Sequence, residues 1–135
     1  MLKLPKKIAE ELRAHAERVY PEECCGVLLG TNAGEERAVQ EARACANWDA
    51  SPRRRYAIAP QDLVRAQREA RERGLAIVGF YHSHPDHAAA PSATDSKEAY
   101  WDGCSYVIVE TQAGRAGELR SYVLRDGQFA EEPVR

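Results

Sequence analysis

The chain has 135 residues and a formal net charge of −2, with 44% hydrophobic and 30% charged residues. This length suits one domain with its own core, so we expect a single domain over residues 1–135. The charge gives no reason to expect a nucleic-acid partner. No apolar run approaches the ~20 residues that cross a bilayer. Charge and proline interrupt residues 1–7, where a signal peptide would need an apolar segment. We therefore expect a cytoplasmic protein with no membrane or nucleic-acid partner.

The cysteines give no sign of a structural metal site. Cys24, Cys25, Cys45 and Cys104 lack the paired Cys-x-x-Cys spacing that such a zinc site uses. Disulfide geometry also strains adjacent residues, so a bridge between Cys24 and Cys25 is disfavoured. We expect reduced thiols, at least one of them buried as a small apolar residue. A nucleophilic Cys24 or Cys25 is the alternative, because four histidines are available as partners.

The first half of the chain predicts two helices and three strands. Apolar residues at helical spacing predict helices over residues 5–20 and 60–73, each beginning at a proline. Short apolar or alternating runs predict strands over residues 24–30, 37–47 and 55–59. Before the last of these, Arg53, Arg54 and Arg55 form a basic run, which we interpret as a solvated loop or strand edge. A contact for an acidic protein or a carboxyl terminus is the functional alternative.

The second half predicts four strands and one short helix. An apolar run predicts a central strand over residues 75–84, and Ser92 begins a helix that we expect to reach Trp101. Further strands are predicted over residues 105–110, 119–124 and 128–134. Alternating strands and helices followed by hairpins predict an α/β fold, a single-domain mixed β-sheet flanked by helices. The sequence contains no phosphate-loop motif and no Gly-x-Ser-x-Gly.

The central strand ends in two histidines. Side chains two apart on a strand share a face, so His82 and His84 should project together while Ser83 points away. Pro85 ends the ladder because it has no N–H to donate, and Asp95 follows in the first turn of the next helix. A catalytic zinc ion typically has three protein ligands and an open fourth position for water. The two histidines and Asp95 therefore predict one such zinc site per chain.

Each of these residues also has a simpler interpretation. The histidines could be a strand pair satisfied by hydrogen bonds, and Asp95 could close a capping box with Ser92. His87 could be a further ligand or a solvated loop residue. Hydrolysis also needs a general base and a donor to the developing oxyanion. Ser92 is the candidate for the donor, and the residues alone leave Glu22 and Glu23 open for the base.

A known family carries this pattern. His-Ser-His-Pro at residues 82–85, followed by Ser92 and Asp95, resembles the signature of the JAMM (MPN+) zinc metalloproteases. Upstream, residues 21–30 are similar to the first-strand segment of that family, in which a glutamate stands two residues after a proline. This similarity selects Glu23 over its neighbour. The resemblance covers most of the chain.

The resemblance implies a fold similar to that of cytidine deaminases, with zinc at one edge of a mixed sheet between helices. It implies that His82, His84 and Asp95 bind zinc. It also implies that Glu23 acts as general base and acid on the attacking water, while Ser92 donates to the oxyanion.

The activity of the family is cleavage of a peptide or isopeptide bond after the C-terminal Gly-Gly of ubiquitin or a ubiquitin-like protein. Only a short helix separates Asp95 from the strand over residues 105–110, which leaves no room for the insertion that grips a second ubiquitin in eukaryotic deubiquitinases. The chain therefore resembles the compact prokaryotic branch. Related enzymes there remove ubiquitin-like modifiers or release cysteine from a sulfur-carrier protein.

Two other functions remain to be weighed. A non-catalytic MPN-type scaffold for protein interactions is the main alternative, although such scaffolds usually lose one or more ligands. A nucleoside or base deaminase would share the fold, but it needs a Pro-Cys-x-x-Cys half-site that the sequence lacks. The expected partner is accordingly a ubiquitin-like modifier or sulfur-carrier protein that ends in Gly-Gly.

Overall fold

A computed structural model describes residues 1–99 and 101–135. The described strands form one mixed sheet in the order β1-β3-β2-β4-β5-β6-β7. Their bounds are β1 Leu2–Lys3, β2 Cys25–Ala33, β3 Glu36–Cys45, β4 Ala76–Pro85, β5 Ser105–Gln112, β6 Arg115–Arg125 and β7 Gln128–Glu132. Pairing is parallel between β1 and β3 and between β4 and β5, and antiparallel elsewhere. The predicted fold class, a mixed β-sheet with helices, is confirmed.

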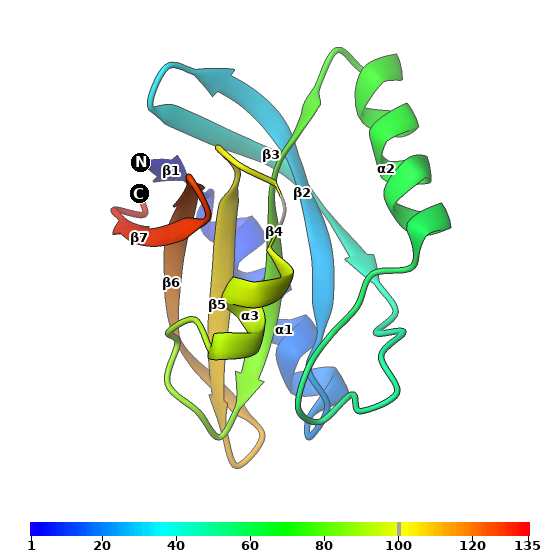
Figure 1. Ribbon diagram of the computed structural model, residues 1–135, viewed down its shortest axis with the longest axis vertical. Coiled ribbons are helices and arrows are strands. Elements are labelled where there is room, and N and C mark those ends of the chain that lie inside the picture. Colours follow the sequence, from blue (N-terminus) through cyan, green and yellow to red (C-terminus); the bar gives the residue numbers. More distant parts are fainter. Residues whose placement is uncertain (100) are drawn as a thin grey trace.

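The described residues form three helices beside the sheet (Figure 1). They are α1 (Lys6–Val19), α2 (Pro60–Glu72) and α3 (Ala93–Glu98). In Figure 1, α1 lies behind the sheet, whereas α3 lies in front of it and α2 lies to one side. None of these described helices is long and apolar enough to cross a bilayer.

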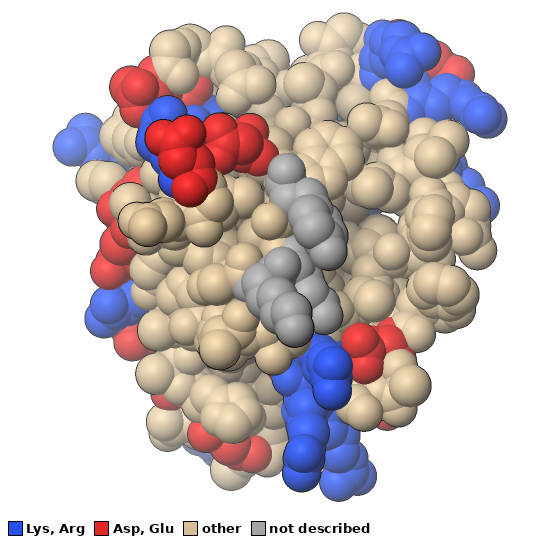
Figure 2. All heavy atoms as spheres, viewed as in Figure 1, with Lys and Arg blue, Asp and Glu red and all other residues tan. Residues whose placement is uncertain are grey.

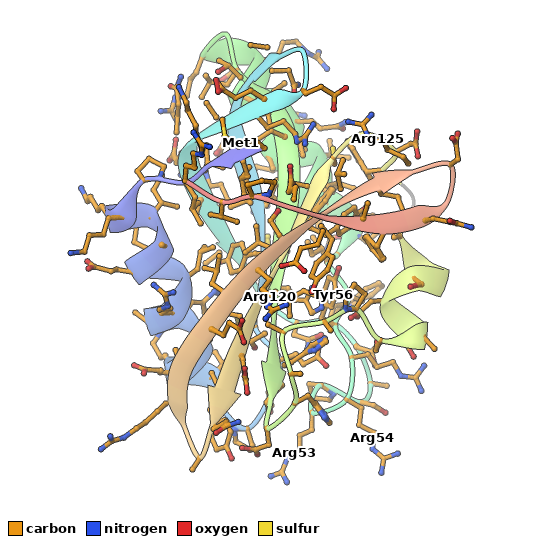
Figure 3. The ribbon with its side chains drawn as sticks, turned by 90° about the vertical axis from the view of Figure 1, so that its left-hand side faces the viewer. Met1, Arg53, Arg54, Tyr56, Arg120 and Arg125 are labelled. Atoms are coloured by element: carbon orange, nitrogen blue, oxygen red, sulfur yellow. The ribbon has the colours of Figure 1, made fainter. Side chains whose placement is uncertain are left out.

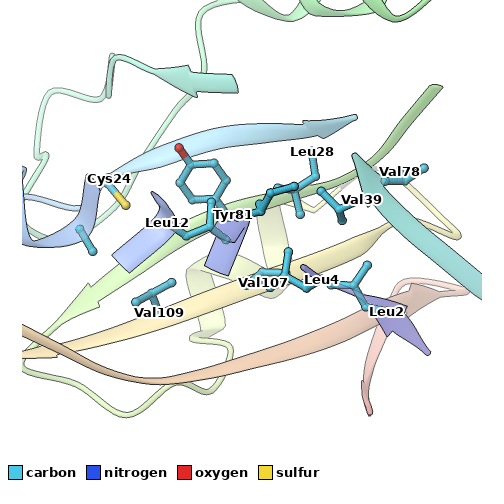
Figure 4. Close-up of a cluster of buried hydrophobic side chains, with 12 residues drawn as sticks. Leu2, Leu4, Leu12, Cys24, Leu28, Val39, Val78, Tyr81, Val107 and Val109 are labelled. Atoms are coloured by element: carbon cyan, nitrogen blue, oxygen red, sulfur yellow. The ribbon is translucent and has the colours of Figure 1, made fainter. Parts of the chain in front are cut away.

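The largest of the described hydrophobic clusters lies on the α1 face of the sheet. Helix α1 contributes Ile8, Leu12 and Ala16 to a cluster whose other buried members come from the strands and the N-terminal segment. Those members are Leu2, Leu4, Cys24, Leu28, Val39, Val78, Tyr81, Val107 and Val109. Figure 4 shows these side chains extending along the sheet from Cys24 and Val109 at one end to Leu2 at the other. This apolar layer fixes α1 to the sheet by burial.

A second core lies on the α2 face. Ala66 and Ala70 of α2 pack with buried residues of the sheet, among them Val27, Phe80 and Tyr106. Phe80 and Tyr81 are neighbours on β4 and belong to opposite cores, as strand alternation requires. Residues of even number at the end of β4 therefore face the side that carries α2, and this side includes both histidines.

A buried ion pair joins the start of β3 to the end of β7. The Nη2 atom of Arg37 lies 2.7 Å from Oε1 of Glu132, and both side chains are 4% exposed. The same carboxylate accepts hydrogen bonds from the hydroxyls of Ser105 and Ser121, at 2.6 and 2.8 Å. The amino group of Met1 lies 3.1 Å from Oε1. All of these contacts to the carboxylate come from hydrogen-bond donors or cations.

Three element predictions need correction. Residues 55–59 form no strand, because their main chain contacts the 47–48 loop rather than a strand: Trp48 N donates to Ala57 O, and the Asn47 side chain accepts from Ala57 N. Helix α3 ends at Glu98 instead of Trp101, because Ala99 is extended, with ψ of 124°. Tyr100, which the predicted helix included, lies outside the described residues. The short strand β1 was not predicted, since two residues are too few for a periodic signal.

Candidate metal centre

The histidine pair lies on the buried central strand of the sheet. His82 pairs with Cys25 of β2 on one side and with Ile108 of β5 on the other. Both histidines are nearly inaccessible, with exposed fractions of 1% for His82 and 4% for His84. Ser83 points to the opposite face, where its Oγ accepts a hydrogen bond from Cys24 N at 2.8 Å. The strand alternation predicted for these residues is therefore present.

Helix α3 brings Asp95 to the same place. Ser92 is the N-cap of the helix, and the complete capping box is present. The Oγ of Ser92 accepts from Asp95 N at 3.0 Å, while Ser92 N donates to Oδ2 of Asp95 at 2.9 Å. The same oxygen lies 3.2 Å from Nε2 of His82 and 3.0 Å from Nε2 of His84. Capping and clustering are thus two uses of one side chain, not competing alternatives.

The three potential ligand atoms fit a small divalent cation. The Nε2 atoms of His82 and His84 are 3.2 Å apart, so the two nitrogens and Oδ2 of Asp95 form a nearly equilateral triangle. Tetrahedral ligands at zinc distances are separated by about 3.4 Å. These three side chains form the potential metal-binding group found among the described residues. The donor set of two imidazoles and one carboxylate suits zinc, with a fourth position left for water.

The hydrogen bond on the far side of His84 orients its ring. Its Nδ1 lies 2.8 Å from the carbonyl oxygen of Ala88, so Nδ1 carries a proton and donates it. The lone pair of a neutral ring is then on Nε2, which faces the carboxylate of Asp95. An acceptor facing an acceptor at 3.0 Å needs a proton or a metal ion between them. This arrangement is what a metal-binding histidine with an outer hydrogen bond requires.

Burial and hydrogen bonding have opposite effects on the pKa values of Asp95 and His84. Burial would raise the pKa of Asp95, but hydrogen bonds from His82 and His84 bring this pKa far below its usual range. Burial lowers the pKa of His82. Burial also acts to lower the pKa of His84, but Asp95 and the Ala88 carbonyl raise it above the ordinary value. The cluster therefore holds an ionised carboxylate beside imidazoles, as metal coordination needs.

Glu23 comes to this site from a position two residues before β2. Its backbone is fixed by Glu23 N donating to Pro52 O at 2.7 Å and by its carbonyl accepting from the Asn47 side chain at 3.1 Å. The residue is 3% exposed, and its Oε1 has no hydrogen-bond partner among the described residues. Burial raises the pKa of Glu23 to about 8; His84 opposes this shift and Asp95 adds to it. A buried carboxyl with an unused oxygen beside the ligands suits a proton carrier.

The remaining candidates lie around this centre. Ser92 is exposed, and its hydroxyl proton is free for another acceptor because its oxygen accepts from Asp95 N. Glu22 is exposed, in contrast to Glu23. His87 is also exposed and does not belong to the potential ligand group, although its ring centroid lies 6.0 Å from that of His84.

Tyr56 is a site neighbour for which the sequence predicted no role. Its ring stacks on that of His82 with centroids 4.4 Å apart and an interplanar angle of 20°. Tyr56 also begins an apolar groove on the α2 side, lined further by Ala57, Ile58, Leu63, Phe80, Trp101 and Tyr106. Figure 2 shows mostly uncharged surface between α2 and the sheet on this face. No local pattern identifies Tyr56, because its irregular segment reaches His82 only through the fold.

The cysteines differ from reactive thiols. Cys24, Cys25 and Cys104 are buried, and all four described cysteines are unpaired. Burial raises the pKa of Cys24 to about 11 and moves that of Cys25 further in the same direction. A thiol that stays protonated is a poor nucleophile, which argues against the alternative role for these two residues.

With this geometry established, comparison with known proteins identifies the family. The family described as prokaryotic homologs of the JAB domain matches residues 5–125. The chain belongs to this family. The predicted resemblance to JAMM proteins is therefore confirmed at the level of the family.

Three relatives of this JAB-domain chain carry names that describe cleavage. A desampylase of Haloferax volcanii is 41% identical over 114 residues, covering 84% of this chain and 78% of the relative. A CysO-cysteine peptidase of Mycobacterium tuberculosis is 37% identical over 121 residues, covering 90% and 81%. A probable TtuB-protein conjugate cleaving protease of Thermus thermophilus is 34% identical over 128 residues, covering 95% and 79%. Each name applies to that relative.

Solved structures agree on the fold. The solution structure of a Desulfitobacterium hafniense protein superimposes with a TM-score of 0.88 at 32% identity, covering all of this chain and 92% of the other. A JAB1/MPN domain protein of Archaeoglobus fulgidus superimposes with a TM-score of 0.60 at 17% identity, covering 99% and 94%. The second comparison concerns the fold alone.

Proposed function

We propose that this protein is a zinc-dependent peptidase or isopeptidase. Its substrate would be the bond after the C-terminal Gly-Gly of a ubiquitin-like modifier or a sulfur-carrier protein, including release of cysteine from such a carrier. His82, His84 and Asp95 would hold one zinc ion per chain, with Glu23 and Ser92 as catalytic residues. Residues 1–135 would form one catalytic domain.

One observation carries this proposal. Three ligand atoms from β4 and α3 converge within 3.0–3.2 Å of one another. The buried carboxyl of Glu23, whose Oε1 has no hydrogen-bond partner among the described residues, interacts electrostatically with His84 and Asp95. Burying three polar groups in this way is costly unless a ligand compensates them. The names of the three relatives support the class of substrate.

Each residue of the candidate site would have a defined task. A bound zinc ion supplies Lewis acidity and makes a coordinated water acidic enough to deprotonate near neutral pH. Glu23 would accept the proton of the attacking water and return it to the departing amine, a task helped by its raised pKa. Ser92 would donate its free hydroxyl proton to the oxygen that becomes negative. Tyr56 would keep the His82 ring in place by stacking.

The apolar groove offers a place for the tail of the carrier. Its lining includes Tyr56, which stacks on His82, together with Ile58, Leu63 and Trp101. An extended peptide in this groove would reach the ligand cluster at its end. Glycines before the scissile bond would fit the narrow approach to buried histidines, because they have no side chain to exclude.

A cleavage panel tests the proposal. The substrates are TtuB and CysO, two proteins that appear in the names of the relatives. Each is prepared as a linear fusion, as a Gly-Gly–lysine isopeptide and as an adduct with a C-terminal cysteine. The full chain is assayed with zinc and with a chelator, and bound zinc is measured by mass spectrometry. We expect cleavage after Gly-Gly with about one zinc per chain, loss of cleavage with chelator and recovery when zinc is restored.

Two variants complete the test. Glu23→Gln should retain zinc and lose cleavage, whereas Glu10→Gln, a change of the same type on the exposed face of α1, should behave as wild type. A fully active Glu23→Gln chain would exclude the proposed mechanism. A chain that binds no zinc and cleaves none of the substrates would instead favour the non-catalytic scaffold.

A further inference from the structure

A tight basic turn lies directly beside the candidate site. It consists of Arg53, Arg54 and Arg55, which we call the basic turn. The preceding residue, Pro52, accepts the hydrogen bond from Glu23 N at 2.7 Å, so the turn is attached to the backbone of the proposed general base. Ser51 O in turn accepts from the backbone N–H groups of Arg54 and Arg55, at 3.0 and 3.1 Å.

Side chains of the preceding loop hold the basic turn in place. The Asn47 amide donates to the carbonyl oxygens of Glu23, Pro52 and Arg55, at 3.1, 3.4 and 2.9 Å. Asp49 accepts from Ser51 N at 2.8 Å. The turn is therefore a defined surface of the molecule whose position relative to Glu23 is set by several hydrogen bonds.

The guanidinium groups of the basic turn make no contacts that stabilise the described part of the fold. All three arginines are exposed, and none forms an ion pair or side-chain hydrogen bond within the part of the chain that the structure describes. Some exposed cations elsewhere on the molecule are paired, such as Arg120 with Glu118 and Arg125 with Glu35. Glu22 lines a hollow with Arg53 and Arg54, so this surface keeps a net positive charge although the whole chain is at −2.

The directions of these side chains indicate the size of the partner. Figure 2 shows Lys and Arg gathered at the lower end of the face that carries α3. In Figure 3, Arg53 and Arg54 lie side by side at the lower end of the molecule and extend away from the ribbon into solvent. A pocket for one small carboxylate would need guanidinium groups that converge. Side chains that spread outward fit an extended acidic surface on a macromolecule.

We propose that the basic turn is the docking surface for an acidic face on the folded body of the carrier or modifier protein whose tail enters the site. The inference rests on the proposed function. Tyr56, the residue next to Arg55, lines the apolar groove and stacks on His82, so the basic turn adjoins both the groove and the ligand cluster along the chain. The groove would recognise the tail, and the turn would recognise the body by charge.

The test compares two double variants with equal changes in charge. Arg53→Glu with Arg54→Glu reverses the basic turn. Lys6→Glu with Lys7→Glu makes the same change at the start of α1, on the other face of the sheet, where acidic residues suit the helix dipole. Each is assayed on the full-length carrier fusion and on a short peptide with the same Gly-Gly tail but no folded body.

The expected result is specific to the folded substrate. Reversing the basic turn should raise KM for the fusion about tenfold at low ionic strength and leave kcat unchanged, because surface charges act mainly on association. Cleavage of the short peptide should stay at the wild-type rate. The advantage of wild type should disappear at about 0.5 M salt, where exposed charges are screened. The Lys6/Lys7 variant should match wild type throughout.

A binding measurement keeps this inference separate from the proposed function. Dissociation constants are measured for intact TtuB and CysO with the full chain carrying Glu23→Gln, with and without reversal of Arg53 and Arg54. We expect about tenfold weaker binding on reversal, and the same loss when acidic side chains around the carrier's tail are changed to amides. Equal losses on the short peptide, equal losses in the Lys6/Lys7 variant, or no loss of binding would each overturn the docking surface. Absence of any cleavage by wild type would overturn only the proposed function.

Discussion

Glu23, two residues before β2, and Glu132, at the end of β7, are both buried glutamates, with exposed fractions of 3% and 7%. The pKa values of their carboxyl groups shift in opposite directions. Burial favours the neutral form of both groups. At Glu132, hydrogen bonds from Ser105, Arg37 and Ser121 reverse this effect and lower the pKa. At Glu23, burial prevails and raises the pKa to about 8.

The difference lies in how the two carboxyl groups are satisfied. The Glu132 carboxylate accepts from Arg37 and two serines and lies near the Met1 amino group, so its contacts are complete and serve the fold. Oε1 of Glu23 has no hydrogen-bond partner among the described residues. Natural proteins rarely leave a buried polar atom unpaired without a functional reason. Completeness of contacts therefore separates the structural cluster from the candidate catalytic one.

The substitution Glu23→Gln tests most directly whether Glu23 differs from Glu132 in serving catalysis rather than the fold. Removal of the proton acceptor should lower kcat for Gly-Gly cleavage by about 10³-fold. The free energy of unfolding should change by less than about 1 kcal/mol, because the carboxyl makes no side-chain hydrogen bond among the described residues that the amide would lose. Cleavage kinetics and urea denaturation of the same preparation measure both. A large loss of stability would place Glu23 with Glu132 as a structural residue.

The opposite outcome is expected for Glu132→Gln. The amide keeps the shape of the side chain but leaves the buried Arg37 guanidinium without its counter-charge, which should cost about 3 kcal/mol of unfolding free energy. The kcat of the folded fraction should be unchanged. Glu131→Gln, the exposed neighbour on β7, is the matched control and should cost less than about 0.5 kcal/mol.

Acid should remove the contribution of Glu132. Its pKa is lowered in the folded state, so the stabilisation is complete above the pKa of the unfolded chain and is lost as pH falls through the folded value. The difference in unfolding free energy between wild type and Glu132→Gln should therefore be constant near neutral pH and should shrink below about pH 4.5. Urea denaturation at pH 7 and at successively lower pH measures this; a difference that grows in acid would contradict it.

Zinc should stabilise the protein by binding to His82, His84 and Asp95, and this effect should not depend on Glu132. An ion that binds only the folded chain stabilises it by about 2.7 kcal/mol at a free concentration of 100 times its dissociation constant. This shift should appear in wild type and in Glu132→Gln, and should be absent in His84→Ala, which removes a proposed ligand. Thermal unfolding with zinc and with chelator gives the comparison. An equal shift in His84→Ala would show that the ion binds elsewhere.

The sequence could predict those parts of the site that depend on local periodicity. Strand alternation correctly placed His82 and His84 on one face with Ser83 opposite, and the capping pattern correctly placed Asp95 in the first turn of α3. Both signals arise within a few residues of the chain. The choice of Glu23 came only from family resemblance, because this residue meets the cluster through the pairing of β2 with β4.

The parts that depend on distant partners could not be predicted in the same way. Residues 55–59 alternate like a strand, yet the backbone partner of Ala57 is Trp48, which lies in a loop. The stacking of Tyr56 on His82 follows from that irregular path. The Arg37–Glu132 pair joins residues 95 positions apart, and nothing in the sequence around either indicates the other.

Ser83 offers the smallest change that tests the comparison within a single strand. It stands between the two histidines but faces the α1 core, where its hydroxyl satisfies the buried N–H of Cys24. Ser83→Ala leaves that N–H unpaired and should cost about 1–2 kcal/mol of unfolding free energy. Zinc content and kcat of the folded protein should be unchanged, because the side chain has no contact with the ligand cluster. A loss of zinc with no loss of stability would mean that side chains on both faces of β4 contribute to zinc binding. The distinction between structural and catalytic polar groups would then not hold for Ser83.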